Sequence, residues 1–162
     1  MKAYVTTLGR SAWGMVNSYH AMLKSEDFQP DVVHIVTEDV YEHLLGKGVE
    51  ALKIISENFG FKPEFSTMVV KQADFVEAGT KVNGLIKDLK KGGYQIAVDI
   101  TAGRKSLVAG TLIPLSKMDV DHVFYLAIST IKDVNKPYPM IPRTMQSLKD
   151  FIKQKEEARG SE

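Results

Sequence analysis

The chain has 162 residues, of which 44% are hydrophobic and 25% charged, a balance typical of one globular domain with its own core. The absence of cysteine excludes disulfide scaffolds, thiolate zinc sites and cysteine nucleophiles. The formal net charge is only +1, so an anionic ligand must be held by a local cluster of cations. No apolar run approaches the roughly 20 residues of a membrane span, and we expect a cytoplasmic protein without a membrane partner.

The first half of the chain alternates between short β-rich runs and segments in which apolar residues recur at helical spacing. The predicted strands are 3–7, 31–36 and 63–70. The predicted helices are 12–23, 41–55 and 74–91. Asp74 and Glu77 stand three residues apart at the start of the third helix, a spacing typical of a capping box.

The second half continues the alternation with strands at 95–99 and 121–128 and a helix from 103 to about 118. The segment 136–141 contains two prolines, which favours a short edge strand or a loop. A weak apolar stripe predicts a terminal helix from 144 to about 156. We expect one domain over 1–157 and a disordered tail over 158–162.

Strands that alternate with helices and carry continuous apolar runs predict an α/β fold, in which a mostly parallel, Rossmann-like sheet has helices on both faces. Right-handed crossovers most simply give the strand order 3-2-1-4-5, with a possible edge strand in addition. In that order the first and fourth strands are neighbours whose helices lie on opposite faces. Ligands bind at such a switch point, so the loops 7–11 and 99–105 are the candidate site.

The loop after the fourth strand has the residue types of a phosphate site. It reads Asp99, Ile100, Thr101, Ala102, Gly103, Arg104, Lys105 and Ser106. Ala102 and Gly103 are small enough for an anion to approach the N–H groups at the start of the next helix. Arg104 can bind two phosphate oxygens at once, and Lys105 adds a mobile charge. Thr101 can cap the helix or bind the ligand.

The simpler interpretation is a capped helix with two exposed basic residues. Cations at a helix N-terminus oppose the helix dipole, however, so Arg104 and Lys105 together indicate that an anion binds there.

The loop after the first strand contributes a second turn of this kind. It reads Thr7, Leu8, Gly9, Arg10 and Ser11. Taken alone, Ser11 is most simply the N-cap of the first helix. Neither loop matches the dinucleotide or phosphate-loop patterns. Glu38 follows the second strand where a ribose-binding acid could lie, but acids are common in first helical turns, and we expect no nicotinamide cofactor. The four histidines lack metal-ligand spacing, so no metal site is predicted.

The two loops together resemble those of the CRISPR-associated Rossmann fold (CARF) family. Its pattern is an aspartate or similar residue ending the fourth strand, then Thr or Ser, a small residue, Gly, any residue, and Lys or Arg. The matching residues are Asp99, Thr101, Ala102, Gly103 and Lys105. Alanine occupies position 102, where the family usually has glycine. The likeness covers most of the chain as a pattern of elements, but its specific residues lie in the two motifs.

This resemblance implies a homodimer whose two sites merge into a symmetric cradle for a cyclic oligoadenylate, the messenger of type III CRISPR defence. Family members either sense the ring or destroy it as ring nucleases. Only one predicted helix follows the last long strand, which favours a stand-alone ring nuclease that binds cyclic tetra-adenylate. No cofactor and no duplex nucleic acid are implied.

The resemblance also implies roles for individual residues in metal-independent cleavage, where a ribose 2′-hydroxyl attacks the adjacent phosphate. Lys105 stabilises charge on the phosphoryl oxygens, and Ser11 positions the 2′-hydroxyl. Arg10 and Arg104 clamp phosphates. The remaining expected ligand-binding residues are Thr7, Leu8, Gly9, Asp99, Thr101, Ala102, Gly103 and Ser106.

Two other functions stay open at this point. The same pocket in a non-catalytic sensor would bind the ring and signal through a separate partner. A domain unrelated to CRISPR would bind a mononucleotide or a sugar phosphate.

Overall fold

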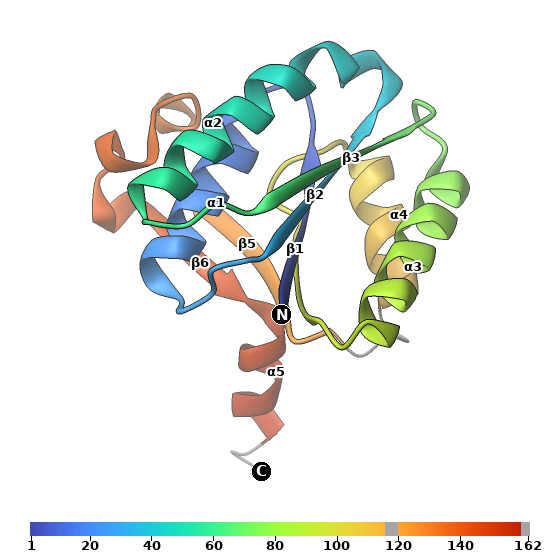
Figure 1. The fold of residues 1–162 in the computed structure, drawn as a ribbon. Coiled ribbons are helices and arrows are strands. Elements are labelled where there is room, and N and C mark those ends of the chain that lie inside the picture. Colours follow the sequence, from blue (N-terminus) through green and yellow to red (C-terminus); the bar gives the residue numbers. More distant parts are fainter. Residues whose placement is uncertain (116–119, 160–162) are drawn as a thin grey trace.

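A six-stranded sheet in the order β3-β2-β1-β4-β5-β6 forms the centre of the molecule (Figure 1). The structure is a computed structural model that describes residues 1–115 and 120–159. The strands are β1 (Lys2–Leu8), β2 (Val32–Glu38), β3 (Glu64–Val70), β4 (Gln95–Asp99), β5 (His122–Ile128) and β6 (Gln146–Asp150). The first five strands are parallel, and β6 pairs antiparallel with β5. The predicted order of the first five strands is confirmed, and an additional edge strand is present, at Gln146–Asp150 rather than at 136–141.

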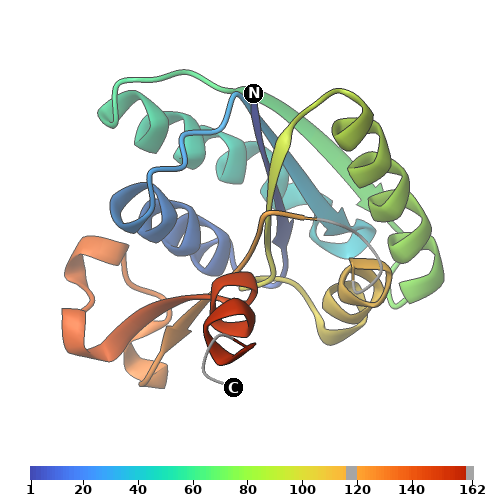
Figure 2. The ribbon, with the colours of Figure 1, turned by 90° about the horizontal axis from the view of Figure 1, so that it is seen from below.

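Helices cover both faces of this sheet, as Figure 2 shows. One face carries α1 (Trp13–Ser25) and α2 (Leu45–Asn58), and α2 is preceded by a 3-10 turn over Asp39–Leu44. The other face carries α3 (Phe75–Lys91) and α4 (Lys105–Leu115). The predicted end of the fourth helix near 118 lies outside the described residues.

Side-chain alternation along β1 divides the core into two layers. Ala3 and Val5 belong to the cluster that includes Ile86 of α3, whereas Tyr4 and Leu8 belong to the cluster under α1 and α2. Because successive residues of a strand point to opposite faces, one buried strand supplies both layers. A strand buried on both faces reads as a continuous apolar run, which is why the central strands could be predicted.

Only one of the two hydrogen bonds of the predicted capping box forms at the N-terminus of α3. Asp74 accepts a hydrogen bond from the Glu77 backbone N–H at 2.8 Å. The Glu77 carboxylate, however, accepts from the Lys71 N–H at 2.8 Å. The chain turns just before this helix, where Ala73 has a positive φ of 59°.

The region after β5 differs from the prediction. Of the two alternatives predicted for 136–141, the structure has the loop, with a 3-10 turn at Tyr138–Met140. The predicted helix from 144 to 156 is wrong in its first part and begins only at Phe151, because 146–150 is β6. Met145, Leu148, Phe151 and Ile152 fit a helical spacing in sequence. Pairing with β5 overrides that pattern, since an extended segment there completes the hydrogen bonds of the β5 edge.

The terminal helix α5 (Phe151–Arg159) includes the first two residues of the predicted tail, and the rest of that tail, 160–162, lies outside the described residues. None of the helices in the described ranges 1–115 and 120–159 has the length and apolar character to cross a membrane.

Asp150 joins β6, β5 and α5 through a single carboxylate. Its Oδ1 accepts from the N–H of Ile152 at 3.1 Å and of Val123 at 3.3 Å, and its Oδ2 lies 2.8 Å from His122 Nδ1. Asp150 is only 7% exposed, so water cannot readily replace these partners.

We therefore expect Asp150→Ala to lower the free energy of unfolding by about 1–3 kcal/mol, through loss of a helix cap and of buried hydrogen bonds. Urea unfolding followed by circular dichroism measures this change. The control is Ser147→Ala on the exposed side of β6. Equal unfolding curves for the two variants would contradict the role given to Asp150.

Candidate functional site

The sheet places the ends of β1 and β4 next to each other, so the loops that follow them share one edge. Thr6 is the partner of Asp99 in the parallel pairing of β1 with β4. Both loops therefore begin at the same level, at the carboxyl edge where α/β proteins bind ligands.

Two glycines allow the loops to touch through their backbones. A Cβ atom added to Gly9 would lie 2.8 Å from both the N and the Cα of Gly103. Gly103 has a φ of +100°, and a Cβ there would lie 3.0 Å from Thr7 Oγ1. Real Cβ atoms essentially never come as close as 2.8 Å, so position 9 requires glycine. Position 103 favours glycine because of its positive φ and the tight approach to Thr7.

Hydrogen bonds hold the second loop between its neighbouring strands. The Thr7 hydroxyl donates to the carbonyl oxygen of Ala102. The Leu126 N–H donates to Thr101 Oγ1 at 2.8 Å, and the Ile100 N–H donates to the Phe124 carbonyl at 3.0 Å. The loop is thus fixed by β1 on one side and by β5 on the other.

Asp99 lies beneath this loop and has no exposed surface. Its Oδ2 accepts from Thr6 Oγ1 at 2.8 Å and from Ser18 Oγ at 2.6 Å. Its Oδ1 accepts from the hydroxyl of Thr101 at 2.6 Å and from its N–H at 3.1 Å. Burial raises the pKa of Asp99, and these hydrogen bonds oppose the rise. The carboxylate therefore fixes the conformation of the loop through its hydrogen bonds to Thr101, and it is too buried to contact a ligand.

A pocket of about 320 Å³ opens between the two loops and the end of β5. Half of its lining comes from predicted site residues, namely Gly9, Arg10, Ser11, Thr101, Ala102 and Gly103. The other lining residues are Gly14, Tyr125, Leu126, Ile128, Val134 and Asn135. Among these described residues there is no histidine and no carboxylate.

Ser11 contributes a hydroxyl to this pocket that is held by two long hydrogen bonds. Its Oγ lies 3.5 Å from Asn135 Oδ1 and accepts a 3.3 Å hydrogen bond from the Trp13 N–H. The N-cap of α1 is Ala12, so the simpler interpretation of Ser11 as the N-cap is wrong. The Thr101 hydroxyl, in contrast, already donates to Asp99 and accepts from Leu126.

A buried carboxylate holds the opposite side of the second loop. Glu38, 1% exposed, accepts from the Ala73 N–H at 2.8 Å and from the Ser106 hydroxyl at 3.0 Å. Arg104 Nε lies 3.6 Å from its other oxygen. Since a buried charge needs partners, Arg104 and Ser106 are drawn toward Glu38 rather than into the pocket. Glu38 is equally unable to bind a ribose, because its carboxylate is enclosed.

The remaining predicted residues divide into buried and exposed groups. Thr7 and Leu8 are buried, with exposures of 1% and 0%. Arg10 and Lys105 are exposed, and neither belongs to an ion pair within the described part of the chain. Lys105 is the first residue of α4, whose first turn closes with the Val108 N–H donating to the Arg104 carbonyl. One of these cations thus lines the pocket and the other begins the helix next to it, an arrangement that attracts anions.

Sequence reasoning missed the wall contributed by β5 and the segment after it. The strand order already places β5 beside β4, so the carboxyl end of β5 had to lie next to the loop. Val134 and Asn135 come from irregular chain, which no periodicity identifies. In the described ranges, no three His, Asp or Glu residues gather closely enough to hold a metal ion.

Comparison with solved structures shows which proteins share this fold. Can2 from Sulfobacillus thermosulfidooxidans, in complex with cyclic tetra-adenylate, matches with a TM-score of 0.58 and 9% identity over 77% of this chain and 32% of that chain. Csm6 from Enterococcus italicus, bound to cyclic hexa-2′-fluoro-hexa-dAMP, matches with a TM-score of 0.62 and 14% identity over 98% and 43%. A type III CRISPR defence DNA nuclease activated by cyclic oligoadenylate matches with a TM-score of 0.57 and 16% identity over 78% and 19%.

At these identities the likeness establishes the fold, which is the Rossmann-like fold expected from the sequence. The chain spans less than half the length of each of these three structures. The sequence matches no protein-family model and no curated protein.

The contact between Gly9 and Gly103 leads to a direct test. We expect Gly103→Ala to lower the free energy of unfolding by about 1–3 kcal/mol, because its backbone conformation is strained for alanine and its Cβ meets Thr7. The matched control is Gly46→Ala in α2, where an added Cβ meets nothing within 4 Å. Thermal or urea unfolding that is unchanged by Gly103→Ala would show that the loops are not in contact.

Proposed function

We propose that this chain is a CARF-type domain that binds cyclic tetra-adenylate in type III CRISPR antiviral defence and cleaves it as a ring nuclease. The observation that carries the proposal is the convergence of the loops 7–11 and 99–106 into one glycine-lined pocket. Arg10 lines this pocket, Lys105 follows Gly103 by two residues, and neither forms an ion pair within the described part of the chain. Proteins with the same fold are described as a complex with cyclic tetra-adenylate and as a nuclease activated by cyclic oligoadenylate.

The size of the pocket supports a site shared between two copies of the chain. A volume of about 320 Å³ lies at the lower end of the range for ligand pockets, which is about 300–1,000 Å³. Four nucleotides need more room than that. Two pockets related by a two-fold axis would each hold half of a four-membered ring, which has the same symmetry. We therefore place the ring across a homodimer.

Charge is the second support, because the ring carries one phosphate per nucleotide. Arg10 lines the pocket, and Lys105 is the exposed first residue of α4, without an ion pair in the part of the chain that the structure describes. Arg104 lies close to Glu38, so it contributes less positive potential than its position in the motif indicates. Lys105 is therefore the cation best placed to neutralise a phosphate bound against Ala102 and Gly103.

In the proposed reaction, the 2′-hydroxyl oxygen forms a bond to the adjacent phosphorus while the bond from that phosphorus to the 5′ oxygen breaks. The 2′ proton leaves and the 5′ oxygen takes up a proton, which gives a 2′,3′-cyclic phosphate and a 5′-hydroxyl. Lys105 stabilises the charge on the phosphoryl oxygens, and Ser11 positions the 2′-hydroxyl. The described lining offers no histidine or carboxylate as a general base, so turnover is expected to be slow.

We expect one molecule of cyclic tetra-adenylate to bind per two chains, with an affinity that falls as the salt concentration rises. Isothermal titration calorimetry gives the stoichiometry, and analytical ultracentrifugation gives the mass of the free protein. A monomer that binds no ring, but whose binding of a mononucleotide or a sugar phosphate is lost in Lys105→Ala, would overturn this proposal in favour of a function outside CRISPR defence.

For catalysis, we expect the wild-type protein to produce linear adenylates from the ring in the presence of EDTA. Lys105→Ala should reduce the cleavage rate by about a hundredfold and weaken binding, because it removes the main charge at the phosphate. Ser11→Ala should mainly slow cleavage. Lys47→Ala, an exposed lysine on α2, serves as the charge-matched control.

Chromatography of the products separates the possible outcomes. Cleavage that persists in Lys105→Ala would contradict the catalytic role of that residue. Binding without any product in the wild type would identify a sensor that acts through a separate partner.

A further inference from the structure

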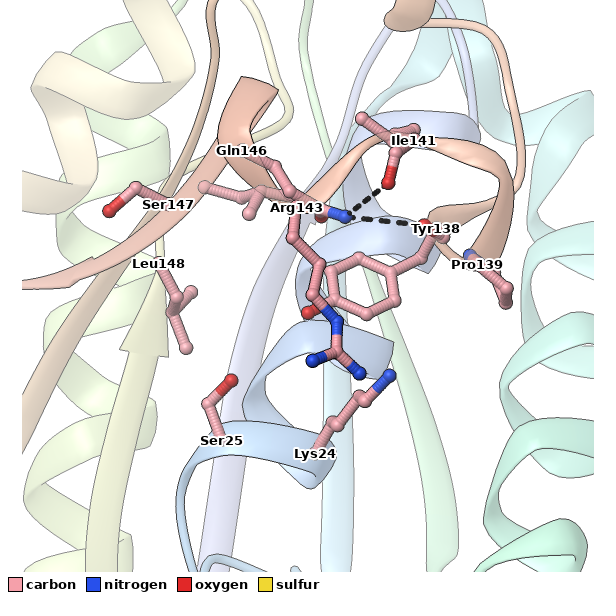
Figure 3. Close-up of a pocket in the computed structure, with 10 residues that line it drawn as sticks. Lys24, Ser25, Tyr138, Pro139, Ile141, Arg143, Gln146, Ser147 and Leu148 are labelled. Atoms are coloured by element: carbon pink, nitrogen blue, oxygen red, sulfur yellow. Dashed lines mark hydrogen bonds between the residues drawn. The ribbon is translucent and has the colours of Figure 1, made fainter.

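A second cavity, larger than the candidate site, lies on the α1 face of the sheet at the other end of that helix. Its volume is about 540 Å³. The floor is formed by β5 and β6, and the walls are formed by the last turn of α1 and by the segment that leads into β6 (Figure 3). A cavity of this size accommodates a ligand as large as a mononucleotide.

The charged side chains that line this cavity are all positive. Lys24 and Arg143 extend toward the same space, as Figure 3 shows, and no aspartate or glutamate is among the described lining residues. Neither cation forms an ion pair within the described ranges 1–115 and 120–159. Two like charges that converge repel each other unless an anion lies between them, so the arrangement favours an anionic ligand.

Hydroxyl donors accompany these cations. Ser25 and Ser147 line the cavity, and no hydrogen bond engages either hydroxyl within the described part of the chain. A guanidinium, an ammonium and hydroxyl groups are the side chains that bind phosphate oxygens, and the planar guanidinium matches two of those oxygens at once.

The wall of the cavity is held in place before any ligand arrives. The side-chain amide of Gln146 donates to the Ile141 carbonyl at 2.9 Å and to the Tyr138 carbonyl at 3.4 Å. Asn17 of α1 donates to the Lys136 carbonyl at 2.8 Å. These bonds fasten the irregular segment to β6 and to α1, so its side chains have defined positions.

Tyr138 adds an aromatic surface to this wall. Its ring packs on His20 with centroids 4.8 Å apart, and the Lys24 ammonium lies 5.7 Å from its centroid. Tyr138 is half-buried, and the accessible part of its ring lies next to converging cations, where it can accept a flat group that is attached to a phosphate.

Leu126 is the one described residue that lines both this cavity and the candidate site. Trp13 begins α1 beside the site, whereas Lys24 lies about three turns further along the helix, roughly 16 Å away at a rise of 1.5 Å per residue. A ligand bound between Lys24 and Arg143 therefore does not contact the loops 7–11 and 99–106.

We propose that this cavity is a second binding site, for a phosphate monoester that carries a planar ring and has the size of a mononucleotide. Lys24 and Arg143 bind the phosphate, and Tyr138 contacts the ring. The assignment does not depend on the function proposed for the other site.

The probes are adenosine 5′-monophosphate and inorganic phosphate, titrated into the ¹⁵N-labelled protein. We expect the nucleotide to shift the side-chain NMR signals of Gln146 and Arg143, and to bind several-fold more tightly than inorganic phosphate. Arg143→Gln should weaken nucleotide binding at this cavity at least tenfold. Tyr138→Leu should remove the preference for the nucleotide while leaving phosphate binding in place.

Lys105→Gln is the matched control, since it removes a cation at the other site. It should change the nucleotide affinity obtained from the Gln146 NMR signal less than twofold. The proposal is overturned if Gln146 does not respond to the nucleotide, or if its response survives in Arg143→Gln. Equal affinity for the two probes would also overturn it. Circular dichroism verifies that each variant is folded.

Discussion

The structure depends on one buried carboxylate at the centre of the sheet. A charge without exposed surface is unfavourable unless its oxygens are fully hydrogen-bonded, and Asp99 meets that condition with donors from β1, from α1 and from its own loop. Because Thr6, Ser18 and Thr101 all bond to it, the end of β1, the middle of α1 and the loop after β4 are held together. The loop that lines the candidate pocket is fixed in one conformation for this reason, as the proposed binding of phosphates would require.

A second buried carboxylate, Glu38, stabilises the same loop from the opposite side and thereby separates the two arginines of the candidate site. Arg104 is drawn toward it, whereas Arg10 lines the pocket. Two residues that look equivalent in the sequence, each following a glycine in a loop, thus have different electrostatic partners. The positive potential of the site consequently comes mainly from Arg10 and Lys105, in addition to the N-terminus of α4.

Much of the fold follows from the sequence, because buried parallel strands and amphipathic helices have distinct patterns. The 95–99 strand has the predicted bounds, and the order of the strands follows from right-handed connections. The segment 146–150 escaped prediction because its pairing with β5 is a long-range interaction that leaves no local signal. At the candidate site, the sequence predicted that these two loops meet, but not the direction of each side chain. Asp99 and Leu8 are internal, and the partner of Ser106 lies 68 positions away in the chain.

The backbone contact between Gly9 and Gly103 also has a consequence for the evolution of the sequence. Neither position can gain a side chain while the other loop stays where it is, so the two codons are under a single constraint although they lie far apart in the gene. A change at one of them is tolerated only together with a retreat of the opposite loop, and such a retreat would alter the pocket. In distant relatives we therefore expect these two glycines to be kept or lost as a pair, which gives a simple marker for the chains that retain this site.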